Sequence, residues 1–215
     1  MLNSFIFILL GGGMTKENIH YKSIFTNEQE LLNAILILHN SSNDIELDPM
    51  FNKGSFYKDT INLPKYRFDI NAIENEYDCE YGDACNLPFK DNSIKSMILD
   101  PPFMFGIHGK TLENKCAKRY TIYEDQWALI SSYNSLLDEA SRILMKDGLL
   151  IFKCQDYTDK KTFMTHCFVY NLAVSKGFYA KDLVLLNKEN KIYNSNLKQR
   201  HFRKTHCYFW VFVKQ

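Results

Sequence analysis

The segment SMILDPPFMF, residues 96–105, limits where one strand of this protein can end. An apolar run leads into Asp100 and then into two consecutive prolines, Pro101 and Pro102. Proline has a fixed φ and no backbone N–H, so two in a row are excluded from the interior of a helix or of a central strand. The strand must therefore end at Asp100, and the prolines hold this acid and the next carbonyl group in a stiff turn.

Strand-like and helix-like stretches alternate along most of the chain. Expected strands lie at 43–49, 66–71, 93–100 and 148–157 and within 78–89, and expected helices at 25–40, 124–148 and 160–177. Such alternation predicts an α/β fold with a mostly parallel sheet. The last two expected strands, 178–188 and 206–215, have no helical pattern between them. We therefore expect an antiparallel strand pair at the C-terminal edge of the sheet.

Length and composition favour one globular domain. The chain has 215 residues, of which 46% are apolar, enough for one sizeable core. Residues 1–13 carry a short apolar run and three glycines, without the features of a secretory signal or the length of a membrane span. We expect 1–13 to be a mis-annotated or disordered leader, translation to start at Met14, and residues 14–215 to form a single domain without membrane association.

The cysteine pattern bears on the compartment and on metal binding. None of the six cysteines forms a Cys-x-x-Cys pair, and no cluster of Cys and His has the spacing of a zinc site. We therefore expect reduced thiols in a cytoplasmic protein and no metal site.

Acidic side chains lie at the ends of four of the expected strands. Asp48, Asp69, Asp83 and Asp100 follow one another at intervals of 21, 14 and 17 residues. Ligands of open α/β sheets bind outside the carboxyl ends of the strands, so these four acids are expected along one edge. Clustered carboxylates repel one another and raise each other's pKa, which does not favour stability. A ligand rich in hydrogen-bond donors would account for them.

These motifs resemble those of the S-adenosylmethionine-dependent amino-methyltransferases that modify nucleic-acid bases, especially the N6-adenine DNA methyltransferases. The resemblance runs from Asp44 to Lys214, and its most specific part is DPPF at 100–103. It implies a Rossmann-like class I methyltransferase sheet, S-adenosylmethionine as the cofactor, and catalysis by Asp100, Pro101, Pro102 and Phe103. The stretches 47–57, 68–71 and 82–89 resemble the cofactor motifs, although the first has one glycine where the family commonly has two or three. The cofactor-binding residues implied are Asp48, Pro49, Phe51, Gly54, Asp69, Asp83 and Ala84.

Elementary chemistry supports the same role for the DPPF turn. An exocyclic amine on adenine is a poor nucleophile, because its lone pair is delocalised into the ring. The Asp100 carboxylate and the Pro101 carbonyl could accept its two hydrogens and direct the lone pair at a methyl donor, while Phe103 stacks on a base swung out of its helix. Asp in the first position favours adenine N6, since cytosine-N4 enzymes usually carry Ser there, but some RNA guanine-N2 enzymes share Asp.

Basic residues gather in two stretches that we expect to contact nucleic acid, with DNA favoured over RNA. Residues 188–215 hold seven Lys or Arg against one Glu, whereas residues 44–83 hold ten acids against four bases. The expected phosphate contacts are Lys110, Lys115, Lys118, Arg119, Lys198, Arg200, Arg203 and Lys204. Recognition would come from these loops, a second copy of the chain or a separate subunit. Two alternatives stay open: an RNA base amino-methyltransferase acting on adenine N6 or guanine N2, and a nucleic-acid-binding protein that has lost the cofactor.

Overall fold

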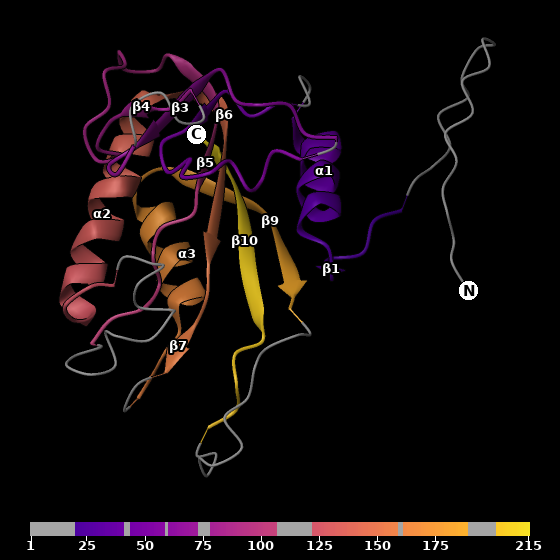
Figure 1. Cartoon of the computed structure of the whole chain (residues 1–215), viewed down its shortest axis with the longest axis vertical. Coiled ribbons are helices and arrows are strands. Elements are labelled where there is room, and N and C mark those ends of the chain that lie inside the picture. The colour runs from indigo at the N-terminus through magenta and orange to yellow at the C-terminus, as the bar shows by residue number, and fades with distance from the viewer. Residues whose placement is uncertain are drawn as a thin grey trace.

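The computed structural model describes residues 20–40, 44–58, 60–72, 78–106, 122–158, 161–188 and 201–215 (Figure 1). The strands are Ile24–Phe25 (β1), Leu47–Asp48 (β2), Tyr66–Asp69 (β3), Glu80–Tyr81 (β4), Ile94–Leu99 (β5), Leu144–Cys154 (β6), Tyr157–Thr158 (β7), Thr162–Phe163 (β8), Phe178–Asn187 (β9) and His206–Lys214 (β10). The helices are Glu28–His39 (α1), Gln126–Ile143 (α2) and Thr165–Ser175 (α3). The leader at 1–13 and the start at Met14 lie outside these residues.

Eight strands form one sheet in the order β1-β9-β10-β6-β5-β2-β3-β4, while β7 and β8 form a separate hairpin. Strands β4, β3, β2, β5 and β6 run parallel, and β10 is antiparallel to both of its neighbours, β6 and β9. The predicted mostly parallel α/β sheet and its C-terminal antiparallel pair are confirmed. One detail differs. The short strand β1 pairs with β9 and forms the edge, so the antiparallel pair of β9 and β10 lies one strand inside it. Two residues are too few to leave a periodic pattern in the sequence.

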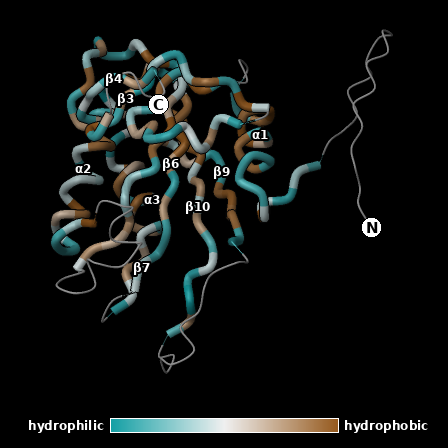
Figure 2. The backbone as a smooth tube through the Cα atoms, viewed as in Figure 1, coloured by the Kyte–Doolittle hydropathy of each residue, from teal (hydrophilic) through white to brown (hydrophobic). Residues whose placement is uncertain are grey.

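Helices cover both faces of the sheet, with α1 on one side and α2 and α3 on the other (Figure 1). Successive strand side chains point to opposite faces, so alternate residues enter different cores. Ile98 and Ile151 pack with α1, whereas Met97 and Phe152 pack with α2 and α3. The hydrophobic segments in Figure 2 accordingly lie along the central strands and along the helices beside them. None of the helices in the described ranges is both long and apolar enough to cross a membrane.

Two helix ends differ from their expected positions. Helix α1 begins at Glu28 and not at residue 25, because it is capped by Asn27, whose side chain accepts hydrogen bonds from the backbone N–H groups of Gln29 and Glu30. Helix α2 ends at Ile143 because β6 begins to pair with β5 at Leu144. Gly148, the last residue of the expected helix 124–148, instead lies inside β6, where a Cβ atom would come within 2.7 Å of a backbone oxygen.

Candidate active site

The four acids predicted from the sequence lie at the carboxyl ends of neighbouring parallel strands. Asp83 lies just beyond β4, Asp69 ends β3, Asp48 ends β2, and Asp100 follows β5. Asp69 and Asp100 both lie close enough to Asp48 to disfavour its negative charge. These four carboxylates form one acidic edge of the sheet, as the sequence predicted.

Asp48 is the buried member of the acidic edge, with 2% of its surface exposed. Its carboxylate accepts the backbone N–H of Met50 at 2.9 Å and the hydroxyl of Tyr57 at 2.8 Å. Burial raises the pKa of Asp48 to about 7, although these two hydrogen bonds act in the opposite direction. Asp48 thus holds both ends of the 48–57 loop, and direct contact between its side chain and a cofactor stays a prediction.

The 48–57 loop uses two residues with positive φ, where the sequence analysis had counted one glycine. Gly54 has φ 63°, and a Cβ atom there would meet the Phe51 ring at 2.6 Å. Asn52 has φ 49°, and asparagine is among the few residues other than glycine that readily adopt this conformation. Asn52 therefore supplies the second tight bend, which its residue type could have signalled. Phe51 packs with Tyr57 in the α1 core and Pro49 is buried, so cofactor contacts by these two residues also stay predictions.

A stability measurement can test the burial of Asp48. The folded pKa lies above the unfolded value, so the native state binds more protons between about pH 4 and pH 7 and loses stability as the pH rises through this window. We expect Asp48→Asn to be more stable relative to wild type at pH 8 than at pH 4, by on the order of 2–4 kcal/mol. Urea unfolding of both proteins at several pH values gives this difference, and equal pH dependence in both would contradict it.

Asp69 and Asp83 present their carboxylates closer to solvent. Asp69 is half-buried, and it accepts the backbone N–H of Asn52 at 2.9 Å and that of Asn71 at 2.8 Å, which joins β3 to the 48–57 loop. Asp83 is exposed and accepts the N–H of Cys85 at 2.9 Å, while Ala84 beside it is buried. Ile70, which follows Asp69, is 57% exposed and offers an apolar surface at the same edge. Ile70 is not among the site residues predicted from the sequence.

The DPPF turn is supported by the central helix α2. The hydroxyl of Tyr133, a residue with no exposed surface, donates to the carbonyl of Pro102 at 2.9 Å. Pro101 is buried, whereas Asp100, Pro102 and Phe103 are half-buried. A partly buried hydrogen bond therefore fixes a turn that the prolines already stiffen. The stacking role of Phe103 stays a prediction.

The structure adds a residue that the sequence analysis missed, Lys153 near the end of β6. Its Nζ atom lies 2.8 Å from Oδ2 of Asp100 and 3.0 Å from Oε1 of Glu28. Burial disfavours the charge, but these two carboxylates outweigh it and hold the pKa of Lys153 above its ordinary value. A lysine inside the apolar run LLIFKC was the signal available in the sequence.

Two of the predicted phosphate contacts, Arg203 and Lys204, lie in the segment just before β10. Arg203 is exposed and Lys204 half-buried, and the backbone oxygen of Lys204 accepts a hydrogen bond from Gln155, which follows β6. The segment before β10 therefore runs beside the carboxyl end of β6, next to β5 and Asp100. The other predicted phosphate contacts lie outside the described residues: Lys110, Lys115, Lys118, Arg119, Lys198 and Arg200.

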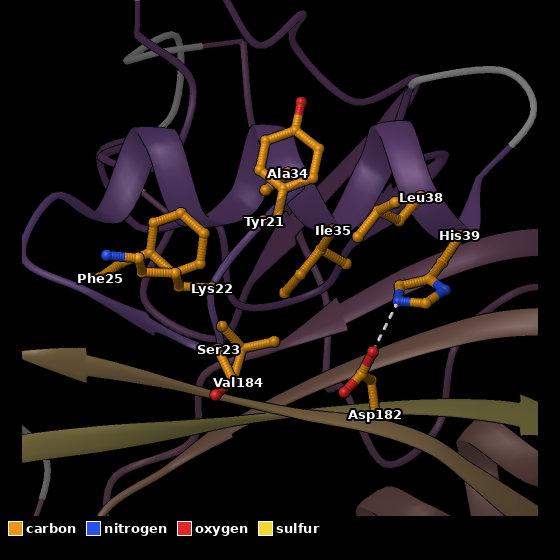
Figure 3. A pocket seen from close by; sticks show the side chains of 10 residues that line it. All are labelled: Tyr21, Lys22, Ser23, Phe25, Ala34, Ile35, Leu38, His39, Asp182 and Val184. Carbon is orange, nitrogen blue, oxygen red and sulfur yellow. Dashed lines mark ion pairs between the residues drawn. The ribbon is translucent and has the colours of Figure 1, made fainter. Parts of the chain in front are cut away.

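A cavity of about 120 Å³ lies elsewhere, between α1, β9 and the segment that includes β1 (Figure 3). Its lining includes Ile35, Val184 and the ion pair of His39 with Asp182. None of the predicted site residues lines it. Within the described ranges, no group of three His, Cys, Asp or Glu side chains is arranged to hold a metal ion.

The strand order and the antiparallel β10 form the Rossmann-like sheet that the sequence predicted. The chain belongs to the DNA methylase family, whose model, named for N6 and N4 methyltransferases, matches residues 94–215. This family depends on S-adenosylmethionine, so the predicted family and cofactor are confirmed. No curated protein matches the chain in sequence.

Solved structures with low sequence identity are similar to parts of this chain. A DNA modification methylase from Thermus thermophilus is 16% identical, with 69% of this chain and 54% of that chain covered and a TM-score of 0.44. Another structure of that methylase is a complex with S-adenosylmethionine. The cytosine-N4-specific PvuII DNA methyltransferase is 17% identical, with 63% and 48% covered and a TM-score of 0.47. The chain thus spans about half the length of these structures.

Proposed function

We propose that this protein transfers a methyl group from S-adenosylmethionine to the N6 amino group of adenine in DNA. Membership of the DNA methylase family supports methyl transfer to nucleic acid. The observation that carries the proposal is the rigid turn at Asp100, which holds a carboxylate and a fixed backbone beside the acidic edge. Asp in the first position of this turn favours adenine N6 over cytosine N4.

The residues present fit the cofactor. When bound, S-adenosylmethionine supplies an electrophilic methyl group on a positively charged sulfur atom. The half-buried carboxylate of Asp69 suits two ribose hydroxyls, and Ile70 offers an apolar surface to the adenine ring. Asp83 and the N–H of Ala84 would read the edge of that ring. Asn52 and Gly54 shape the backbone of the 48–57 loop, and Asp48 holds its two ends together.

The catalytic residues act on the target amine. The Asp100 carboxylate and the Pro101 carbonyl accept its two hydrogens and turn the nitrogen lone pair toward the methyl group. The nitrogen–carbon bond forms with this lone pair as the carbon–sulfur bond breaks, and the sulfur keeps that bond's electrons and becomes neutral. Asp100 then takes the proton that the methylated nitrogen loses and passes it to water. Phe103 stacks on the base.

The substrate side of the proposal involves the segment before β10. Arg203 and Lys204 would contact phosphates next to the target base, together with the predicted basic residues outside the described ranges. A second copy of the chain or a separate subunit would supply further recognition. RNA substrates and cofactor-free nucleic-acid binding are the competing functions.

One experiment separates these functions. The protein is incubated with labelled S-adenosylmethionine and, in turn, with double-stranded DNA, single-stranded DNA and RNA, and the digested nucleosides are identified. We expect N6-methyldeoxyadenosine. Labelled N4-methyldeoxycytidine would contradict the target base, and label found only in RNA would contradict the substrate. Calorimetry without binding of S-adenosylmethionine at high micromolar concentration would favour the cofactor-free function instead.

A further inference from the structure

Three charged side chains from separate elements meet behind the DPPF turn. Lys153 from β6 bridges Asp100, which follows β5, and Glu28, in the first turn of α1. The side chain of Lys153 is 12% exposed, and its ammonium also lies 4.8 Å from the centre of the Phe56 ring in the 48–57 loop. We call Glu28, Lys153 and Asp100 the charged trio.

Stability alone gives little reason for a charged trio that is partly buried. Desolvation of buried ions often cancels their attraction, and apolar residues of similar volume stabilise a protein as well or better. Oε1 of Glu28 is buried and makes no hydrogen bond within the described residues, so the ion contact with Lys153 is what compensates it. The trio includes the proposed catalytic acid, Asp100, and Lys153 contacts its carboxylate directly, which points to a role in the reaction.

We propose that Lys153 is the positioning residue of the methyl-transfer site and that Glu28 cancels the charge of Lys153. Lys153 holds Oδ2 of Asp100, so that Oδ1 is oriented to accept a hydrogen of the target amine. This inference rests on the proposed function. It assigns residues of α1 and β6 to a reaction otherwise attributed to the DPPF turn and the acidic edge.

The net charge of the trio gives a reason for the presence of Glu28. With Lys153 and Asp100 alone, the positive and negative charges cancel at the place where the cationic sulfur must bind. Glu28 gives the trio one net negative charge, which attracts that sulfur before transfer, when it is positive, and less after transfer, when it is neutral. Loss of this charge should therefore weaken binding of S-adenosylmethionine more than binding of its neutral product, S-adenosylhomocysteine.

Other titratable groups lie around Asp100. Asp48 is the last residue of the neighbouring strand β2, Tyr133 lies on α2, and Cys154 follows Lys153 on β6. Burial raises the pKa of Tyr133 and of Cys154, so both stay neutral in the working range. Without Lys153, the carboxylates of Glu28 and Asp100 would have no cation between them, and a neighbouring like charge disfavours the ionised form of a carboxyl group. The acid limb of the rate profile would then move to higher pH.

The test compares Lys153→Met, Lys153→Arg and Glu28→Gln with wild type, and uses Lys146→Met, an exposed lysine on the same strand, as the matched control. We expect Lys153→Met to lower turnover at pH 7 more than about tenfold and to move the acid limb of the kcat/KM profile upward by about one pH unit or more. Lys153→Arg keeps the charge and should keep the acid limb in place. Glu28→Gln should weaken S-adenosylmethionine binding about fivefold or more by calorimetry, with S-adenosylhomocysteine within about twofold.

The outcomes separate this inference from the proposed function. If the wild-type protein binds no S-adenosylmethionine, the proposed function itself fails. If wild type is active but Lys153→Met keeps its turnover and its acid limb, or Glu28→Gln weakens both ligands equally, the trio is only structural and the inference is wrong. Thermal melting reports folding, and if Lys153→Met does not fold, the ligand preference of Glu28→Gln decides.

Discussion

Replacement of Asp100 by asparagine should lower methyl transfer at least about 100-fold, because it removes a charged acceptor that acts on the reacting amine. Asparagine keeps the size of the side chain and one carbonyl oxygen, so the turn and the hydrogen bond from Tyr133 to Pro102 should persist. S-adenosylhomocysteine, whose sulfur is neutral, should bind within about twofold of wild type. Single-turnover kinetics and calorimetry measure the two quantities.

Asp83→Asn is the contrasting variant. The Asp83 side chain lies beyond β4, and asparagine can still accept the N–H of Cys85. We expect this change to weaken both cofactor ligands and to leave the rate of transfer from the bound complex near that of wild type. Turnover of Asp100→Asn within fivefold of wild type would remove Asp100 from the catalytic role.

Arg142→Met should lower the free energy of unfolding by about 3 kcal/mol, because it leaves a buried carboxylate without its partner. Glu139 on α2 is 6% exposed, and its carboxylate accepts two hydrogen bonds from Arg142 and one from the N–H of Leu87. Arg142 also donates to the backbone oxygens of Leu87 and Phe89. The variant should therefore also loosen the segment that follows Asp83. Urea unfolding measures the loss.

Two further variants control for this effect. Glu139→Gln combined with Arg142→Met removes the unpaired charge of Glu139. We expect the double variant to recover much of the free energy of unfolding that Arg142→Met loses. Lys176→Met breaks a more exposed ion pair between α2 and the end of α3, with Asp138, and should cost less than about 1 kcal/mol. Equal losses in Arg142→Met and Lys176→Met would show that Glu139 is not the cause.

The catalytic motif could be predicted because it is local. Two prolines after an apolar run end a strand whatever the rest of the chain does, and acids at four expected strand ends follow the same reasoning. The ends of the helices were harder to predict from the sequence. Helix α2 ends at Ile143 because pairing between β5 and β6 competes with the helix, and neither Gly148 nor the pattern before it carries that information.

The shape of the 48–57 loop could be predicted only in part from the sequence. The sequence showed one glycine in this stretch, Gly54, whereas Asn52 adopts positive φ as well and was not predicted to do so. The loop is held by Asp48 through Tyr57, nine residues away, and by Asp69 through Asn52, seventeen residues away. Contacts across such spacings follow from how β2 and β3 pair, and they leave no periodic pattern.

The sequence by itself determined the fold class, the position of the DPPF turn and the acids that end the strands, because each depends on a few adjacent residues and their backbone preferences. Only the tertiary structure decided what surrounds Asp100. Lys153 reaches it because β6 lies beside β5, and Glu28 reaches Lys153 because α1 packs on the same face of the sheet. The pairing of distant charges depends on which strands become neighbours, and that is settled by burial of the whole core.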